Sequence, residues 1–220
     1  MDSQRNLVLT GFMGAGKSTI GALVAQRLGR PFIDMDAEIE VRLGKSIPDI
    51  FAEDGEAAFR DHERALCLEL ADRDGLVIAT GGGALVDLSS RGAMAQNGTI
   101  VCLTCGIDEL VRRIERGPHY RPLLDPVDPH STIEALLKKR TEAYAALPWH
   151  VDTTGRLPNE IVADVLDLLF AKQLEVRGSK STYPIHIGAG LLQHLGDAVC
   201  ASGLPAGSKT VVVSNDVVFP

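Results

Sequence analysis

LVLTGFMGAGKSTI, from Leu7 to Ile20, is the stretch that decides the fold. It begins with a short apolar run, passes through a glycine-rich turn and reaches Lys17 and Ser18, where a helical pattern starts. The pattern GxxxxGKS between a strand and a helix is typical of a phosphate-binding loop. Its glycines let backbone N–H groups surround a polyphosphate, while Lys17 reaches the terminal phosphates and Ser18 offers a hydroxyl to Mg²⁺. The stretch predicts a nucleoside triphosphate site; a glycine-rich turn that binds nothing is the alternative.

Outward from this loop, strand and helix patterns alternate along the chain. Strands are predicted at 7–10, 30–34, 76–80, 99–103 and 149–151. Helices are predicted at 18–28, 35–44, 47–52, 55–73, 87–96, 107–116, 131–147 and 159–170. Such alternation predicts an α/β fold in which helices flank a doubly wound parallel sheet.

Composition limits the possible partners. The chain of 220 residues has a formal net charge of −7 and no run of Lys and Arg, which argues against nucleic acid or an anionic membrane as a partner. No stretch approaches the roughly eighteen apolar residues of a membrane span, and MDSQRN lacks the apolar segment of a signal peptide, so we expect a cytoplasmic protein. Cys102 and Cys105 form a CxxC at the end of an apolar strand, and strand alternation explains it better than metal or redox chemistry.

Two aspartates follow the second predicted strand in the sequence FIDMD. Asp34 and Asp36 stand two residues apart, so both carboxylates project in the same direction if the chain remains extended. Such a pair suits metal and hydroxyl chemistry. The alternative is that one of them caps the helix that follows.

Two further motifs carry polar or glycine residues to the same region. FRDHE places Arg60 and Glu63 on one face of a helix, although exposed ion pairing alone accounts for that spacing. TGGG puts Gly81–Gly83 after the third strand, at the sheet edge where ligands of parallel α/β proteins bind; a flexible turn is the alternative.

The segment GPHYRPLLDPVDPH, residues 117–130, contains four prolines and no periodicity. A loop of this length is able to close over a site and carry its one cation, Arg121, onto bound phosphate; an ordinary proline-rich connection is the alternative. The helix that follows carries KKR at 138–140, of which one or two residues must face inward if its apolar stripe packs.

Taken together, GFMGAGKST, FIDMD, FRDHE, TGGGA, RPLL and KKRTEAY resemble, in this order, the shikimate kinase family over about residues 6–169. The resemblance implies a P-loop kinase fold with a five-stranded parallel sheet in a domain at 1–172. It implies that ATP, with Mg²⁺, phosphorylates the 3-hydroxyl of shikimate in the pathway to chorismate and the aromatic amino acids. We expect this kinase domain to be monomeric on its own.

The resemblance also assigns roles to residues. It implies ATP-binding roles for Gly14, Ala15, Gly16, Lys17, Ser18, Thr19, Arg113, Arg121, Arg156 and Pro158, and metal-binding roles for Ser18 and Asp34. It implies substrate-binding roles for Asp36, Arg60, Gly81, Gly82, Gly83, Arg121 and Arg140, with Glu63 orienting Arg60. The catalytic residues would be Lys17, Arg121 and Asp36, the last as general base. Planar guanidinium groups suit a substrate carboxylate, and an aspartate suits its hydroxyls.

Residues 173–220 begin a new pattern of strand, hairpin, strand, a helix at 191–201 and a strand at 210–214. Fewer than about fifty residues bury too little surface to fold alone, so we expect an incomplete second α/β segment. YPIHIGAGLL followed by VVVSND resembles the start of 3-dehydroquinate synthase, which implies a bifunctional parent protein. NAD and Zn²⁺ would belong only to the missing synthase part, and we expect no synthase activity from these residues.

Two alternative functions remain open from the sequence. The first is another small-molecule P-loop kinase, acting on gluconate or a nucleoside monophosphate, and the second is a non-catalytic nucleotide-dependent scaffold. The arginine pair with Asp36 favours a hydroxylated carboxylic acid, and the presence of candidate base, metal ligand and lid arginine argues against a scaffold.

Overall fold

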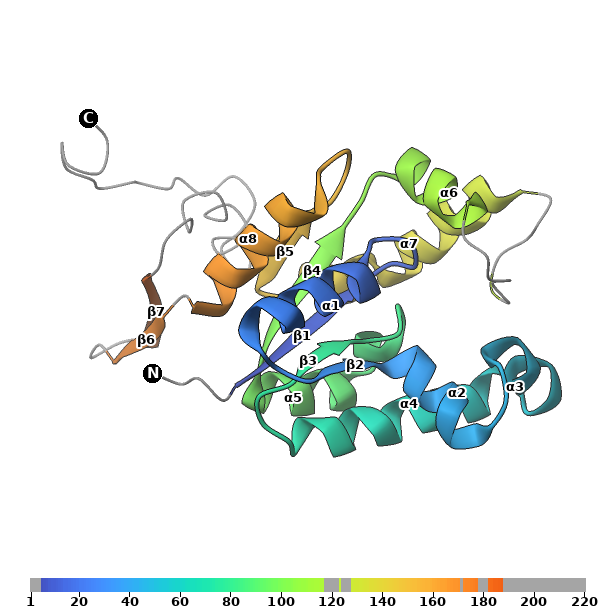
Figure 1. The fold of residues 1–220 in the computed structure, drawn as a ribbon, viewed down its shortest axis with the longest axis horizontal. Helices are drawn as coiled ribbons and strands as arrows, with labels where there is room; N and C mark the ends of the chain where they lie inside the picture. Colours follow the sequence, from blue (N-terminus) through green and yellow to red (C-terminus); the bar gives the residue numbers. More distant parts are fainter. Residues whose placement is uncertain (1–4, 117–122, 124–127, 171, 178–181, 188–220) are drawn as a thin grey trace.

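The computed structural model describes residues 5–116, 123, 128–170, 172–177 and 182–187 (Figure 1). Arg121, most of the proline-rich segment, and the helix and strand predicted at 191–201 and 210–214 lie outside the described residues.

A five-stranded parallel sheet forms the centre of the fold, as the resemblance implied. Its order is β2 (Phe32–Asp34), β3 (Val77–Ala79), β1 (Asn6–Gly11), β4 (Gly98–Thr104) and β5 (Trp149–Asp152). The first strand in the chain therefore lies in the middle, where Leu9 pairs with Ala79 on one side and Val101 on the other. The phosphate loop that follows β1 is thus flanked by the ends of β3 and β4, which brings distant motifs to one sheet edge.

Helices cover both faces of this sheet (Figure 1). Their bounds are α1 (Lys17–Leu28), α2 (Met35–Leu43), α3 (Ile47–Glu53), α4 (Gly55–Ala71), α5 (Leu88–Asn97), α6 (Ile107–Glu115), α7 (Pro129–Ala145) and α8 (Pro158–Phe170), with a short 3₁₀ turn η1 (Ala84–Val86) that the sequence did not predict. Leu7 and Leu9 pack with α1 and α8, while Val8 packs with α2, α4 and α5 on the opposite face. This alternation along β1 is the period of two expected of a strand buried on both faces.

Asn6 fixes the position of α4 relative to the sheet. Its buried side-chain amide donates to the carbonyls of Arg73 (2.6 Å) and Leu70 (3.3 Å), and its side-chain oxygen accepts from the N–H of Leu76 (2.8 Å). The end of α4 and the start of β3 are therefore tied to β1, which holds the residues of α4 in register with the phosphate loop.

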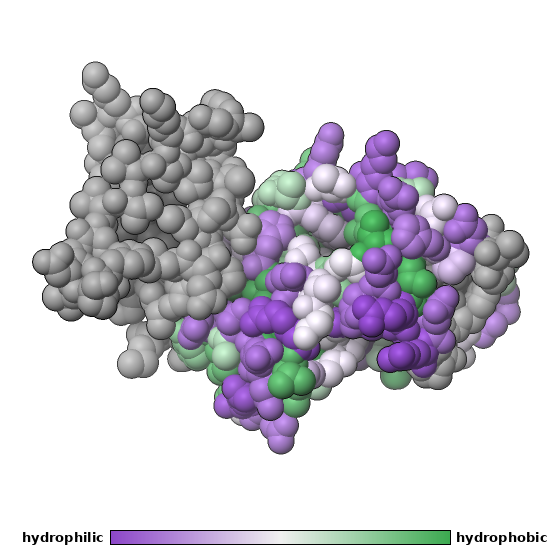
Figure 2. All heavy atoms as spheres, turned by 90° about the horizontal axis from the view of Figure 1, so that it is seen from above, coloured by the Kyte–Doolittle hydropathy of each residue, from purple (hydrophilic) through white to green (hydrophobic). Residues whose placement is uncertain are grey.

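The tail contains a separate antiparallel hairpin, β6 (Lys172–Arg177) and β7 (Thr182–Ile187). This agrees with the predicted strand, hairpin and strand. None of the helices in the described part of the chain is long and apolar enough to cross a bilayer. On the face shown in Figure 2, hydrophilic residues cover most of the coloured surface and apolar ones are scattered among them.

Candidate active site

The phosphate loop has the backbone that its glycines predict. Gly11, Gly14 and Gly16 have φ values of 132°, 81° and 98°, a region that side-chain-bearing residues rarely adopt. A Cβ on Gly11 would collide with the carbonyl oxygen of Leu103 on β4. Lys17 donates to the Phe12 carbonyl (3.0 Å), so its ammonium group lies across the loop. The glycines therefore serve the local geometry and the close packing of the loop on β4.

A cavity of about 490 Å³ opens over this loop. Every described residue that the resemblance assigned to ATP lines it, namely Gly14, Ala15, Gly16, Lys17, Ser18, Thr19, Arg113, Arg156 and Pro158. Arg113 joins three elements there, since it donates to the Gly14 carbonyl (3.3 Å), to the Thr153 carbonyl (2.8 Å) and to Glu109 (2.9 Å). These contacts hold one wall of the cavity in place.

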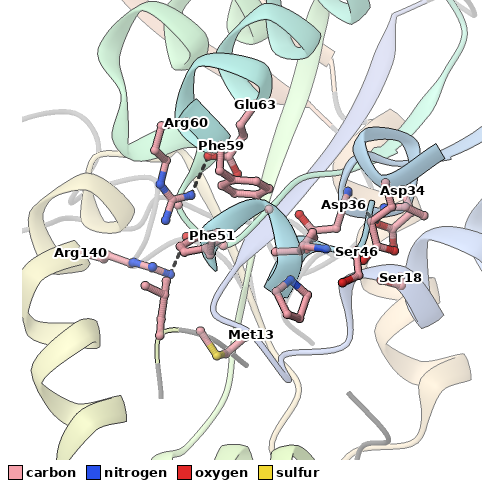
Figure 3. Close-up of a pocket in the computed structure, with 18 residues that line it drawn as sticks. Met13, Ser18, Asp34, Asp36, Ser46, Phe51, Phe59, Arg60, Glu63 and Arg140 are labelled. Carbon is pink, nitrogen blue, oxygen red and sulfur yellow. Dashed lines mark hydrogen bonds and ion pairs between the residues drawn. The ribbon is translucent and has the colours of Figure 1, made fainter. Parts of the chain in front are cut away.

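A second cavity of about 550 Å³ adjoins the first. Met13, Ser18, Asp34, Asp36 and Gly82 line both, so the two cavities meet at these residues. In Figure 3, Arg60 and Arg140 lie on one side of the second cavity, and Asp34, Asp36 and Ser18 lie on the other. A ligand in this cavity would meet guanidinium groups at one end and carboxylates at the other.

Asp34 and Asp36 reach this place without the extended backbone on which their predicted alignment depended. β2 ends at Asp34 and α2 begins at Met35, so the chain is not extended between the two aspartates. Asp34 caps α2, because its Oδ1 accepts from the N–H groups of Asp36 (3.1 Å) and Ala37 (3.4 Å). The capping alternative is thus correct for Asp34, and both carboxylates line the cavities all the same.

Arg60 and Glu63 are not an exposed ion pair. Arg60 Nη1 lies 2.7 Å from Glu63 Oε2, and the Glu63 side chain is only 3% exposed. Glu63 Oε1 has no hydrogen-bond partner among the described residues. Burial raises the pKa of Glu63 although Arg60 opposes the rise. Burial lowers the pKa of Arg60, but Glu63 and Glu56 outweigh it, and the net direction is upward.

The inward-facing cation of the KKR triplet is Arg140. It is buried, whereas Lys138 and Lys139 are exposed. Its guanidinium donates to the Gly82 carbonyl (2.9 Å) and lies 5.3 Å from the centre of the Phe12 ring. The helix that follows the proline-rich segment thereby contacts both the phosphate loop and the TGGG motif.

The three glycines of TGGG are packed against charged groups. A Cβ on Gly81 would collide with Glu63 Oε1, one on Gly82 would lie 3.0 Å from Arg140 Nη1, and one on Gly83 would lie 2.8 Å from Arg60 Nη1. A merely flexible turn would not require this closeness. The motif therefore packs directly against the charged side chains of this cavity.

Sequence reasoning missed several residues that line the second cavity or contact its wall. Phe51 and Phe59, whose ring centres are 5.0 Å apart, form an apolar wall with Ile47 and Pro48. Tyr144 donates its hydroxyl to the Gly82 carbonyl (2.6 Å). Its position four residues after Arg140 puts both on one helix face, a signal available from KKRTEAY.

Of the cysteine pair, Cys102 lies in β4, and Cys105 follows the strand and is half-buried. Cys102 is buried in β4, where burial raises its pKa to about 12. Within the described ranges, no three His, Cys, Asp or Glu side chains gather into a possible metal site.

The shikimate kinase family model matches residues 13–170. The shikimate kinase of Pseudomonas fluorescens is 45% identical over 166 residues, covering 75% of this chain and 96% of the relative. That of Thermus thermophilus is 41% identical over 173 residues, covering 79% and 94%. Among solved structures, the shikimate kinase of Acinetobacter baumannii in complex with shikimate has a TM-score of 0.71 at 37% identity, covering 74% of this chain and 92% of that one. The family match ends at residue 170, so it gives no support to the resemblance of the tail to 3-dehydroquinate synthase.

Proposed function

This chain belongs to the shikimate kinase family, and from that premise we propose that it transfers the γ-phosphoryl group of ATP to the 3-hydroxyl of shikimate. The observation that carries the proposal is the junction of two cavities at Ser18, Asp34, Asp36 and Gly82. Phosphoryl transfer needs donor and acceptor aligned with their charges stabilised, and two adjoining cavities with a shared wall provide that alignment.

On the donor side, the residues fit Mg²⁺. A hydroxyl from Ser18 and a carboxylate from Asp34 line both cavities, and Mg²⁺ prefers oxygen ligands and usually takes only one or two from the protein. Both capping hydrogen bonds of Asp34 end on Oδ1, which leaves Oδ2 to hold the metal, directly or through water. The bound ion would neutralise and orient the phosphates. Lys17 would bind the terminal phosphates from the other side.

On the acceptor side, we assign Arg60 and Arg140 to the substrate carboxylate, because their guanidinium groups lie together in the second cavity. Asp36, at the shared wall, would accept the proton of the 3-hydroxyl as it attacks the γ-phosphorus. Gly82 and Gly83 would present backbone N–H groups beside the substrate. Arg121, outside the described residues, remains assigned to the lid that bridges substrate and transferred phosphoryl.

The direct test is ADP release with ATP, Mg²⁺ and shikimate, compared with gluconate and AMP as acceptors. Of the three acceptors, we expect only shikimate to cause ADP release. Asp36→Asn should abolish measurable turnover, because loss of a positioned base typically lowers kcat roughly 10²- to 10⁴-fold. The Kd for ATP, measured by calorimetry, should stay within about twofold of the wild-type value. An active Asp36→Asn variant would remove Asp36 as the base, and turnover of gluconate or AMP in preference to shikimate would overturn the substrate assignment.

We propose separately that residues 173–220 open a second domain similar to 3-dehydroquinate synthase, so that the parent protein is bifunctional. The antiparallel hairpin β6–β7, in a sheet of its own, is compatible with the start of a new folding unit. The 220-residue chain should phosphorylate shikimate and show no synthase activity with NAD and Zn²⁺ added. The longer parent protein should show both activities, and a parent without synthase activity would contradict the proposal.

A further inference from the structure

The Gly82 carbonyl accepts two hydrogen bonds from α7. Arg140 Nη1 donates at 2.9 Å and the Tyr144 hydroxyl donates at 2.6 Å. A carbonyl oxygen has two lone pairs, so these two donors saturate it. Gly82 and Tyr144 are 62 residues apart in sequence, which makes this contact a specific link between α7 and the TGGG motif.

This link fixes the peptide unit that joins Gly82 to Gly83. The described chain contains no cis peptide bond, so the N–H of Gly83 points opposite to the Gly82 carbonyl. With the carbonyl held toward α7, that N–H is directed away from α7. Gly83 also lies against Arg60, whose Nη1 would be 2.8 Å from a Cβ on Gly83. The peptide orientation therefore decides whether the Gly83 N–H or the Gly82 carbonyl faces the side on which Arg60 lies.

Tyr144 is well suited to hold this orientation. Its ring packs against residues of both hydrophobic clusters, and its own carbonyl lies 3.0 Å from His150 Nε2. Burial raises the pKa of Tyr144 to about 12, so the hydroxyl keeps its proton at neutral pH and remains a donor. Tyr144 is thus a fixed hydrogen-bond donor rather than an acid or base.

We propose that Tyr144 is a positioning residue for substrate binding: its hydroxyl, beside Arg140, holds the Gly82 carbonyl toward α7, which turns the Gly83 N–H toward the substrate carboxylate. This inference rests on the proposed function. Without the hydroxyl, the carbonyl keeps one donor and the peptide gains freedom to turn its oxygen toward the anion. The effect should therefore be specific to ligands that carry the carboxylate.

The test compares Tyr144→Phe with wild type in shikimate affinity and kinetics. Loss of one neutral hydrogen bond, about 1 kcal/mol, should raise the KM and Kd for shikimate about fivefold. The kcat and the KM for ATP should stay within about twofold. The Ki of methyl shikimate, which lacks the charge, should not change. A matched control is Arg91→Met, because Arg91 donates to the Ala143 carbonyl (3.1 Å) on the same turn of α7 without touching Gly82, and it should leave shikimate affinity unchanged.

Unchanged shikimate affinity in Tyr144→Phe would overturn the inference. An equal loss of affinity for methyl shikimate in that variant, or an equal loss of shikimate affinity in Arg91→Met, would also overturn it. If the variant does not fold, the inference is tested on the wild-type protein by NMR spectroscopy. The Tyr144 hydroxyl proton should exchange slowly with water and shift in NMR spectra when shikimate binds, and a signal that does not shift would contradict the proposal. Failure of wild type to bind shikimate would instead refute the proposed function, so the two failures are distinguishable.

Discussion

Glu63→Gln is the substitution that most sharply separates a binding role from a structural role in this site. It keeps the shape of a side chain that is 3% exposed but removes its charge. In the wild type, Glu63 Oε2 accepts from Arg60 Nη1 at 2.7 Å. Hydrogen bonds to charged groups contribute about 1.5–3 kcal/mol, and with Gln only the guanidinium keeps its charge, which places the variant at the weak end of that range. A loss of about 1–1.5 kcal/mol in the positioning of Arg60 should therefore weaken shikimate binding about 5- to 12-fold.

The same substitution should not lower stability at neutral pH. Burial raises the pKa of Glu63 above its ordinary value of 4.5 in the folded state, so folding takes up a proton between those two pKa values. The contribution of Glu63 to stability therefore falls as pH rises from 4.5 through the folded pKa. Above that range the wild type carries the cost of a buried carboxylate, which Gln removes. We expect the free energy of unfolding of Glu63→Gln, relative to wild type, to increase across this range and to be constant below pH 4.5.

Calorimetry with shikimate and urea unfolding at several pH values measure the two effects. Glu56→Gln is the matched control, because Glu56 pairs with the same guanidinium at 3.0 Å but its side chain is 54% exposed. Exposed pairs contribute about 0–1 kcal/mol, so this control should change shikimate affinity less than about threefold. A Glu63→Gln variant that binds shikimate as wild type does and unfolds more easily would refute the reasoning, since Glu63 would then be a stabilising ion-pair partner only.

Three other substitutions test separate parts of the site. Asp34→Asn keeps an oxygen that caps α2, so it should lower the free energy of unfolding in urea by only a few tenths of a kcal/mol, whereas Asp34→Ala should lower it by about 1 kcal/mol. Both variants should need a higher Mg²⁺ concentration for half-maximal activity. An unchanged Mg²⁺ requirement would exclude the metal role. Gly11→Ala should lower the free energy of unfolding by at least about 2 kcal/mol, because φ is 132° and the Leu103 carbonyl occupies the space; a wild-type urea midpoint would contradict this. Arg113→Ala removes hydrogen bonds to Gly14 and Thr153 and should raise the KM for ATP about tenfold in steady-state assays without changing that for shikimate.

Much of the fold was predictable because its signals are local. The five strands and eight helices predicted up to residue 170 are all present in the described structure, with ends shifted by a few residues at most. All three glycines of the phosphate loop, Gly11, Gly14 and Gly16, have positive φ, a backbone that suits the glycine-rich turn expected there. The 3₁₀ turn at Ala84–Val86 was missed, because a three-residue helix has no periodicity to detect.

Burial at the site was not predictable from spacing. Arg60 and Glu63 are three residues apart on α4, and so are Asp61 and Arg64 on the same helix. The Glu63 side chain is 3% exposed and that of Asp61 is 75% exposed, although the two spacings are identical. The difference arises because Glu63 packs against Gly81, which follows β3, and Asn6 holds the start of β3 in register. That contact depends on tertiary structure, which the pattern FRDHE does not contain.

The two cavities therefore differ in how their sequence determinants are distributed. Half of the residues that line the proposed donor cavity come from one contiguous stretch, residues 13–20. The acceptor cavity is assembled from α4, α7 and the TGGG motif, and its central hydrogen bonds join residues 58 and 62 positions apart. A change at Tyr144 or in the register of α4 would alter the proposed acceptor cavity without replacing any residue of the phosphate loop. For that reason Tyr144 and Glu63, rather than the phosphate loop, are the residues at which the proposed acceptor preference is best tested.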